Sequence, residues 1–437
     1  MSSLPGRRPV VPESVSEFLA SPRFTSVLSM AAIGMAFSTH VLRSTIGWPG
    51  LIGALCGLVV LAAASFIAQR HYIEWHGLLP ISLIAFVVWC ALTVLWTDYQ
   101  WTAVSGVVYQ VAFAFLGVYI ALVRDTIQVV RAVGDVLRVL LTASLVLEVL
   151  SGILLDLPIR FLGIQGNIAH GGPIQGLFGT RNQLSIVALI AFVTFLVELR
   201  TRSVLQRRAI PSILLAVLCL ALAHSPVIAA VLVVVAVATL ALYGLRKVPP
   251  HARPYVQWSL AIVTLAIAVL CYVFRTGVIN LLNARADFSV RYDTWIQMWQ
   301  MIPLRELQGW GWVGLWRHNL VPFASIDFFS GSTHSNGLNA FLDVYLQTGL
   351  VGLVAFLVLL ALAFSRAWVL ASNKRTVVHV WLPLVLIALL STSLFESSIL
   401  IESGWLLVVV CAVKAAQSLS WRDALPHRAP TRAAEDL

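Results

Sequence analysis

The sequence predicts an all-α, polytopic membrane protein with about twelve transmembrane helices. Of its 437 residues, 59% are hydrophobic and only 11% are charged, against about 25% charged residues in a typical soluble domain. Apolar runs of about 20 residues, the length that spans a bilayer as a helix, recur along the whole chain. This composition excludes a soluble enzyme, a disordered protein and a nucleic-acid-binding domain.

The apolar runs divide the chain into twelve expected spans. They cover residues 24–42, 46–67, 77–96, 101–123, 136–155, 183–198, 209–224, 226–244, 256–275, 341–364, 377–395 and 400–417. We expect residues 24–417 to form a single transmembrane domain between a cytoplasmic N-terminal tail, 1–23, and a cytoplasmic, disordered C-terminal tail, 418–437. An even number of spans places both termini on the same side of the membrane.

Basic residues indicate the orientation. If the N-terminus is cytoplasmic, 21 of the 29 Lys and Arg residues fall in cytoplasmic segments. The other eight fall outside and are Arg43, Arg160, Arg181, Arg275, Arg285, Arg291, Arg305 and Arg317. Because short cytoplasmic loops are enriched in Lys and Arg, we expect a multi-pass protein of the inner, cytoplasmic membrane with both termini in the cytoplasm.

Two expected extracytoplasmic loops, 156–182 and 276–340, are the longest outside connections. The second loop, with the residue before it, is rich in arginine and tryptophan: Arg275, Arg285, Arg291, Arg305, Arg317, Trp295, Trp299, Trp310, Trp312 and Trp316. Guanidinium groups bind phosphate oxygens and indole rings offer apolar faces to sugars. This loop therefore suits an anionic lipid-linked sugar, although an interfacial belt against lipid headgroups has the same composition.

Residues 288–302 are expected to form a short helix along the outer surface. Pro303 should end it, because the residue before proline avoids helical geometry. Arg291, Trp295 and Trp299 follow i, i+4, i+8 spacing, and we expect them to share one face. The helix would then direct Arg291 toward a lipid phosphate, unless this arginine merely snorkels.

Several short motifs follow one another in an informative order. They are 176-GLFGTRNQ-183, Arg291-x3-Trp295, Pro303-x5-Gly309-Trp310-Gly311, the stretch from His334 to Asn339, and 347-QTGLVG-352. In this order they resemble the motifs of the O-antigen ligase / O-antigen polymerase superfamily. Twelve spans with one long outside loop between spans nine and ten match that superfamily as well.

The resemblance implies a membrane-embedded glycosyltransferase of the GT-C type that uses neither a metal nor a cofactor. Its donor would be a glycan on an undecaprenyl-diphosphate carrier, delivered with the help of a flippase. Its acceptor would be a glycan, a lipid or a cell-wall polymer outside the membrane. By the same resemblance, Arg291 grips the carrier diphosphate and His334 activates the acceptor hydroxyl as a general base.

Further residues complete the candidate site. The substrate-binding set is Arg291, Arg181, Arg285, Trp295, Asn339 and Asp343. In many superfamily members the histidine directly precedes the asparagine, whereas His334 lies five residues before Asn339. The base therefore has the alternatives His170, His318 and His224.

A second family arginine normally follows a serine at the start of span eight, but here 224-HSP-226 places Pro226 in that position. The second cation for the diphosphate is therefore open. The candidates are Arg181, Arg285, Arg160 and His224. The loops contain no Asp-x-Asp sequence that would suggest a metal.

Four acids near the expected membrane boundary each have two interpretations. Glu148 and Asp343 lie inside apolar spans, where an unpaired carboxylate is costly, so they either serve substrates or form buried pairs. Glu396 and Glu402 flank the last outside turn and either line the acceptor entrance or are solvated.

Other functions compete with glycan transfer. A secondary transporter also fits twelve spans, but it predicts internal repeats and broken helices with charges near mid-bilayer, and no repeat is evident. A lipid-linked glycan flippase or a scaffold predicts that His334 can be replaced without loss of function. The sequence does not decide between a ligase and a polymerase.

Overall fold

The computed structural model describes residues 13–70, 80–281 and 285–417, and in these ranges it contains helices and no β-strand. The α-helices are α1 (Glu13–Ala20), α2 (Pro22–Phe37), α3 (Thr39–Ala68), α4 (Ile81–Leu92), α5 (Gln100–Val123), α6 (Thr126–Val149), α7 (Arg181–Thr201), α8 (Gln206–Leu222), α9 (Pro226–Lys247), α10 (Arg253–Val273), α11 (Arg275–Leu281), α12 (Arg285–Met301), α13 (Phe323–Ser330), α14 (Ala340–Asn373), α15 (Trp381–Thr392) and α16 (Glu402–Gln417). Eight short segments accompany them: a π-helical turn, η2 (Leu150–Leu154), and the 3-10 helices η1 (Thr93–Leu95), η3 (Arg160–Leu162), η4 (Asn167–His170), η5 (Gly176–Phe178), η6 (Ile302–Arg305), η7 (Val377–Val380) and η8 (Ser398–Leu400). The all-α prediction is confirmed.

Seven helices in the described ranges are long and apolar enough to cross a membrane. They are α3, α5, α6 with its π-helical turn, α7, α9, α10 and α14. A helix also lies at each of the five other predicted spans, but α2, α4, α8, α15 and α16 are each shorter than 18 residues. The chain is therefore membrane-embedded, and the count of twelve crossings stays a prediction.

Helix ends differ from the hydropathy pattern where a helix continues beyond its apolar run. Helix α6 begins at Thr126 rather than near residue 136, because Asp125 and Gln128 form a capping box ahead of the apolar stretch. The expected N-terminal tail also contains a helix, α1, whose Leu19 carbonyl accepts a hydrogen bond from Ser65 Oγ at 2.8 Å. The predicted C-terminal tail, 418–437, lies outside the described residues.

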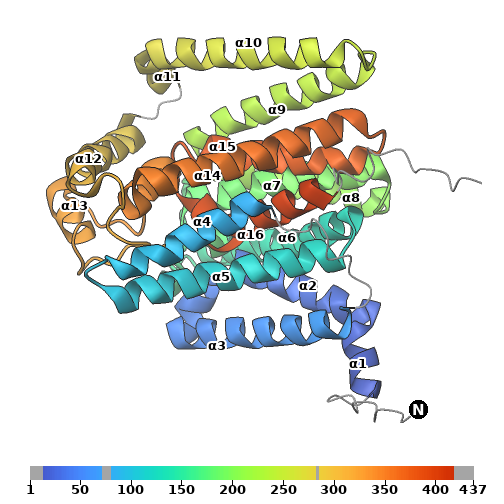
Figure 1. Ribbon diagram of the computed structural model, residues 1–437, viewed down its shortest axis with the longest axis horizontal. Helices are drawn as coiled ribbons and strands as arrows, with labels where there is room; N and C mark the ends of the chain where they lie inside the picture. The colour runs from blue at the N-terminus through green and yellow to red at the C-terminus, as the bar shows by residue number, and fades with distance from the viewer. Residues whose placement is uncertain (1–12, 71–79, 282–284, 418–437) are drawn as a thin grey trace, which may run out of the picture.

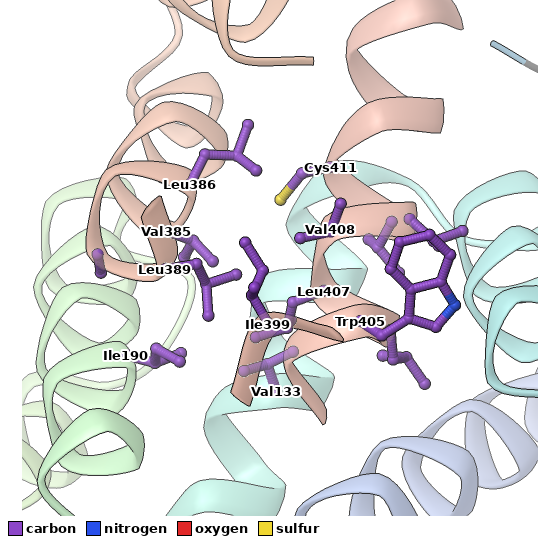
Figure 2. Close-up of a cluster of buried hydrophobic side chains, with 14 of the residues drawn as sticks. Val133, Ile190, Val385, Leu386, Leu389, Ile399, Trp405, Leu407, Val408 and Cys411 are labelled. Atoms are coloured by element: carbon purple, nitrogen blue, oxygen red, sulfur yellow. The ribbon is translucent and has the colours of Figure 1, made fainter. Parts of the chain in front are cut away.

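The core lies between α6, α7, α15 and α16. Figure 2 shows side chains from these four helices meeting around Ile399 of η8. Helices α15 and α16 are buried along almost their whole length, with Trp381 and Trp405 fully enclosed. The short helices α15 and α16 lie inside the bundle. The turn between them lies at one end of the bundle, where its Glu396 contacts Arg291 of the 276–340 loop.

The 276–340 loop is largely helical. Figure 1 shows α12 and α13 together at one end of the bundle, beyond the ends of α4, α5 and α14. Helix α10 lies at the opposite edge from α3, outside α9, and none of its apolar stretch is buried. The helix predicted over 288–302 is confirmed: α12 ends at Met301 and η6 follows at the proline.

Candidate functional site

A break in α14 fixes the 276–340 loop to the helix bundle. Gly349 has φ +69° inside α14, so the carbonyls before it lose their helical partners. Two of them accept hydrogen bonds from the loop: Trp310 N–H donates to Leu346 O at 3.0 Å and Gly311 N–H to Gln347 O at 2.8 Å. The two sequence motifs 309-GWG-311 and 347-QTGLVG-352 thus form one structural unit.

The contact at this break is too close for a side chain. A Cβ on Gly349 would overlap Leu307 O, and a Cβ on Gly309 would overlap Gly349 N. Gln347 completes the unit because its Oε1 accepts the N–H groups of Val313, at 2.8 Å, and Gly314, at 3.0 Å. The glycine spacing in the sequence therefore reflects close packing of loop backbone on helix backbone.

Asp343 is the buried anchor of this loop. Its side chain is fully enclosed, and Oδ1 accepts hydrogen bonds from Trp316 Nε1 at 2.8 Å and Gln347 Nε2 at 2.7 Å. Oδ2 accepts the Gly337 N–H at 2.9 Å. All of these donors belong to the loop or to α14 itself, so the geometry assigns Asp343 to loop anchoring rather than to direct substrate contact.

The loop has a small apolar core of its own. It consists of Met298, Ile302, Trp310, Val313, Trp316, Phe323, Ile326 and Leu346, with Tyr99 and Trp295 packed against it. Burial raises the pKa of Tyr99 to about 12, so this phenol stays neutral. The described part of the loop from Trp295 on is thus packed around its own apolar core.

The buried face of α12 is narrower than the i, i+4, i+8 spacing of Arg291, Trp295 and Trp299 predicts. Arg291 is 5% exposed and Trp295 is half-buried, and Trp295 Nε1 donates to Gly337 O at 3.1 Å. Trp299 is 55% exposed, so the prediction that all three share one face is wrong for the third residue. Eight residues turn a helix about 80° past two full turns, and the inward position falls to Met298 instead.

Arg291 belongs to a polar network built from four separate segments. One of its Nη atoms lies 2.7 Å from Glu396 Oε1, and its Nε donates to Phe395 O at 3.0 Å. The same Glu396 oxygen accepts a hydrogen bond from Asn182 Nδ2 at 2.7 Å. Asn182 Oδ1 in turn accepts the Ser225 hydroxyl at 2.8 Å. The network joins α12, the α15–α16 turn and the N-terminal ends of α7 and α9.

This network explains two sequence motifs. Asn182 is the asparagine of 176-GLFGTRNQ-183, and Ser225 is the serine of 224-HSP-226 that also caps α9 through the Ile228 N–H at 3.4 Å. Pro226 occupies the first turn of α9, where its missing N–H costs no hydrogen bond. The position therefore serves helix initiation and carries no cation.

His334 is buried beside an acid. Its backbone N–H donates to Asp327 Oδ1 at 3.0 Å, and its Nδ1 lies 3.4 Å from the same oxygen. The other carboxylate oxygen of Asp327 lies 2.7 Å from His318 Nδ1. On the far side of the ring, Nε2 lies 3.2 Å from Ser332 Oγ and 3.4 Å from Thr294 Oγ1. The contact between Nδ1 and Asp327 is not a hydrogen bond, since Nδ1 has no hydrogen-bond partner in the described structure. If the ring proton lies on Nδ1, Nε2 is the accepting nitrogen.

A cavity of about 350 Å³ opens beside His334. Its walls come from the start of α3, the start of α7, the 333–338 segment and the α15–α16 turn, and they include His334, Glu396, Glu402, His40 and Arg43. Of the two interpretations of Glu396 and Glu402, the geometry favours the one in which they line a cavity. We call this space the His334 cavity.

Glu402 holds the opposite wall of the His334 cavity. Its Oε1 lies 2.5 Å from an Nη atom of Arg43 and accepts the Tyr109 hydroxyl at 2.9 Å. Its Oε2 accepts the Thr39 hydroxyl at 2.5 Å. The Glu402–Arg43 pair therefore lines this cavity together with His334, whereas of the Glu396–Arg291 pair only the carboxylate does.

The remaining predicted residues have structural positions. Asn339 caps α14, because its Oδ1 accepts the N–H groups of Phe341 and Leu342, while its Nδ2 donates to Leu394 O. Arg181 is the first residue of α7, directly before Asn182. The side chain of Arg285 lies outside the described part of the chain.

Three of the alternative residues lie away from the His334 cavity, whereas His318 contacts the same Asp327 as His334. Arg160, His170 and His224 are exposed, and none of them lines it. The 156–182 loop is anchored by Glu148 of α6, whose Oε1 accepts the N–H groups of Gln175, at 2.9 Å, and Gly176, at 2.8 Å. Within the described ranges, no group of three or more His, Cys, Asp or Glu side chains is arranged to hold a metal ion.

Sequence reasoning did not assign roles to Arg43, His40, Asp327 and Ser225. His40 and Arg43 lie where the first apolar run ends, and the only available signal there was a basic residue outside. Asp327 was visible only as an isolated acid seven residues before His334. In comparisons with known proteins, no family model and no curated protein matches this chain.

Proposed function

We propose that this protein is a membrane glycosyltransferase that moves a glycan from an undecaprenyl-diphosphate carrier to an acceptor at the extracytoplasmic face. The observation that carries the proposal is the His334 cavity, which a buried histidine lines together with the Glu402–Arg43 pair and with Glu396, the partner of Arg291. The motif order that resembles the O-antigen ligase / polymerase superfamily supports it, because those motifs build the walls and the anchor of this cavity.

The proposed reaction needs an anion site and a base. As the bond between the anomeric carbon and the diphosphate oxygen breaks, negative charge grows on the diphosphate, and a fixed guanidinium stabilises it. Arg291 is held by Phe395 O and Glu396, so its position is set before the donor arrives. The diphosphate would share Arg291 with Glu396 or displace that carboxylate.

His334 is the proposed base. An acceptor hydroxyl in the place of Ser332 Oγ would give its proton to Nε2 while its oxygen forms the new bond to the anomeric carbon. Asp327 faces Nδ1 and would stabilise the imidazolium that results. Asp327 therefore acts on the reaction only through the orientation and charge of His334, as a positioning residue.

The test is transfer by purified protein in nanodiscs, with lipid-linked oligosaccharide extracted from the producing cells as donor. We expect His334→Gln to lower turnover by about 10²–10⁴-fold and to leave donor binding within about twofold. His170→Gln, an exposed histidine of the other loop, is the matched control and should transfer normally. Normal turnover in His334→Gln would reject the base and favour a flippase or scaffold.

One observation favours the alternative of a transporter, namely the broken helices α3 and α14, with non-helical Gly47 and Gly349. In transporters such breaks expose backbone carbonyls to a substrate near mid-bilayer. Here the carbonyls freed at Gly349 bind loop N–H groups and the Trp89 indole instead. Net movement of a solute into vesicles that contain only this protein would support the transporter.

The proposed orientation places the 276–340 loop outside the cell and both termini in the cytoplasm. Replacing the exposed native thiols Cys56 and Cys271 by serine gives a clean background for labelling. A cysteine at Ser325 should then react with an impermeant thiol reagent on intact cells, whereas one at Leu205 should react only after lysis. The reverse pattern would overturn the topology and the outside location of the site together.

A further inference from the structure

A second cavity, of about 520 Å³, opens beside the His334 cavity. The two spaces share Arg43, Leu315 and Ser335 as lining residues. The other lining residues of the second cavity are Trp48, Trp316, Arg317, His318 and Asn319. The two cavities are therefore adjacent.

Two arginines meet on one indole ring in the second cavity. The guanidinium carbon of Arg43 lies 5.2 Å from the Trp48 ring centroid, and that of Arg317 lies 5.6 Å from the same centroid. Trp48 follows the break at Gly47 in α3, whereas Arg317 comes from the 276–340 loop. The ring thus gathers two like charges from distant parts of the chain at one wall.

Only one of these charges has an acid against it. Arg43 is paired with Glu402 at 2.5 Å. Arg317 is exposed, and in the described part of the chain no carboxylate forms an ion pair with it. The nearby His318 already faces Asp327 at 2.7 Å. The second cavity therefore carries an uncompensated guanidinium at its wall, which attracts an anion.

We propose that the second cavity binds an anionic saccharide, with Arg317 and Arg43 taking a carboxylate or phosphate group and Asn319 and Ser335 bonding sugar hydroxyls. Amide and hydroxyl groups beside arginines suit a charged sugar better than a lipid headgroup. The shared wall with the His334 cavity places the next sugar of such a chain toward His334. That this saccharide is the acceptor rests on the proposed function, whereas the binding site itself does not.

The experiment measures binding without any donor. Full-length protein in phosphatidylcholine nanodiscs is titrated with trigalacturonic acid and, separately, with the neutral maltotriose. We expect trigalacturonic acid to bind at least about tenfold more tightly than maltotriose, and Arg317→Gln to remove about tenfold of that affinity. Because Arg317 is exposed, this variant should fold normally.

Arg305→Gln is the matched control. Arg305 belongs to the same loop and also stacks on an indole, 4.7 Å from the Trp310 centroid, but Asp98 neutralises it at 2.7 Å. It lines neither cavity, so this variant should bind trigalacturonic acid like the wild type. Equal loss in both variants would show a general charge effect and overturn the site.

Two further outcomes would also overturn the proposal. One is equal affinity for the charged and the neutral trisaccharide. The other is competition by phosphatidylglycerol that Arg317→Gln removes, which would make a lipid headgroup the occupant. Loss of binding in Arg317→Gln together with normal transfer in His334→Gln would retain this anion site and reject the proposed function, so the two failures are distinguishable.

Discussion

The two long loops at the site are anchored in the same way but differ in what they offer. Each is held by one buried carboxylate near a helix end. Glu148 of α6 accepts two backbone N–H groups of 156–182, and Asp343 of α14 accepts the Gly337 N–H and the Trp316 indole N–H of 276–340. The 276–340 loop has its own apolar core and supplies both His334 and Arg291. The 156–182 loop contributes Asn182 at its last position.

The comparison shows that an acid near the membrane boundary is not by itself a sign of catalysis. Glu148 and Asp343 are 2% and 0% exposed and bind protein donors. Glu396 and Glu402 line the cavity and pair with arginines. The two groups of acids differ in their hydrogen-bond partners. Glu148 and Asp343 accept N–H groups of the loops, which need an acceptor whatever the protein's function, whereas Glu396 and Glu402 pair with arginines beside a cavity.

The largest effect on folding should come from Asp343→Asn. Both oxygens of Asp343 accept hydrogen bonds, and an amide would turn an N–H₂ group toward either the Gly337 N–H or the pair formed by Trp316 and Gln347. Two donors would then face each other in a buried site. We expect a loss on the order of 3 kcal/mol in unfolding free energy, measured by thermal unfolding in detergent.

The same variant should lose more than thermal stability. Because Asp343 positions the segment that leads to His334, Asp343→Asn should make 316–338 sensitive to limited proteolysis. Asn336→Asp is the control, because aspartate keeps the oxygen that accepts the Leu338 N–H at 3.0 Å. A wild-type melting temperature for Asp343→Asn would contradict the anchoring role and return this acid to substrate binding.

The sequence predicted the helices better than the site. Hydropathy located the helices because each apolar run acts locally, and Pro303 marked the end of α12 for a local reason as well. The polar network is different, because Asn182 and Glu396 lie 214 positions apart and Arg291 and Glu396 lie 105 apart. Such pairings depend on tertiary packing, which no spacing rule contains.

The site residues divide in the same way. His334 and Arg291 were proposed from the order of the motifs, whereas Asp327 and Arg43 had no pattern around them. Helical spacing placed Trp299 on the wrong face, since the drift of about 80° over eight residues exceeds what a narrow inward face tolerates. Asp343 and Asn339 were chosen for their position in a motif, and the structure gives them anchoring and capping contacts.

A smaller effect is expected at the junction of the two loops, from Asn182→Ala. This change removes the hydrogen bonds to Glu396 and from Ser225 but leaves the Arg291–Glu396 pair in place. We expect a loss of about 1–2 kcal/mol in unfolding free energy and a several-fold drop in transfer, because Glu396 loses one of the donors that fix it.

The control for Asn182→Ala is Gln183→Ala, the next residue of α7, which lines the His334 cavity although Asn182 does not. No side-chain hydrogen bond of Gln183 joins the network among the described residues. If both variants transfer at the wild-type rate, the 156–182 loop contributes to the fold but not to transfer. Only the 276–340 loop would then contribute to the reaction.

The smallest effect should come from Glu148→Gln. Only Oε1 of Glu148 accepts the Gln175 and Gly176 N–H groups in the described structure, so the carbonyl oxygen of glutamine can replace it without turning a donor toward a donor. The variant loses the extra strength of charge-assisted bonds, and we expect a cost of no more than about 1 kcal/mol. Glu148→Leu, which removes both acceptor oxygens, should cost several times as much.

Thermal unfolding of these two variants beside Asp343→Asn measures the contrast between the loops directly. The expected order of cost places Glu148→Gln well below Asp343→Asn, because one carboxylate uses a single oxygen and the other uses both. If Glu148→Gln is as damaging as Asp343→Asn, the number of oxygens in use does not explain how the loops are held. The charge of each buried acid then becomes the quantity to explain, since an amide keeps the shape of the side chain and removes only that charge.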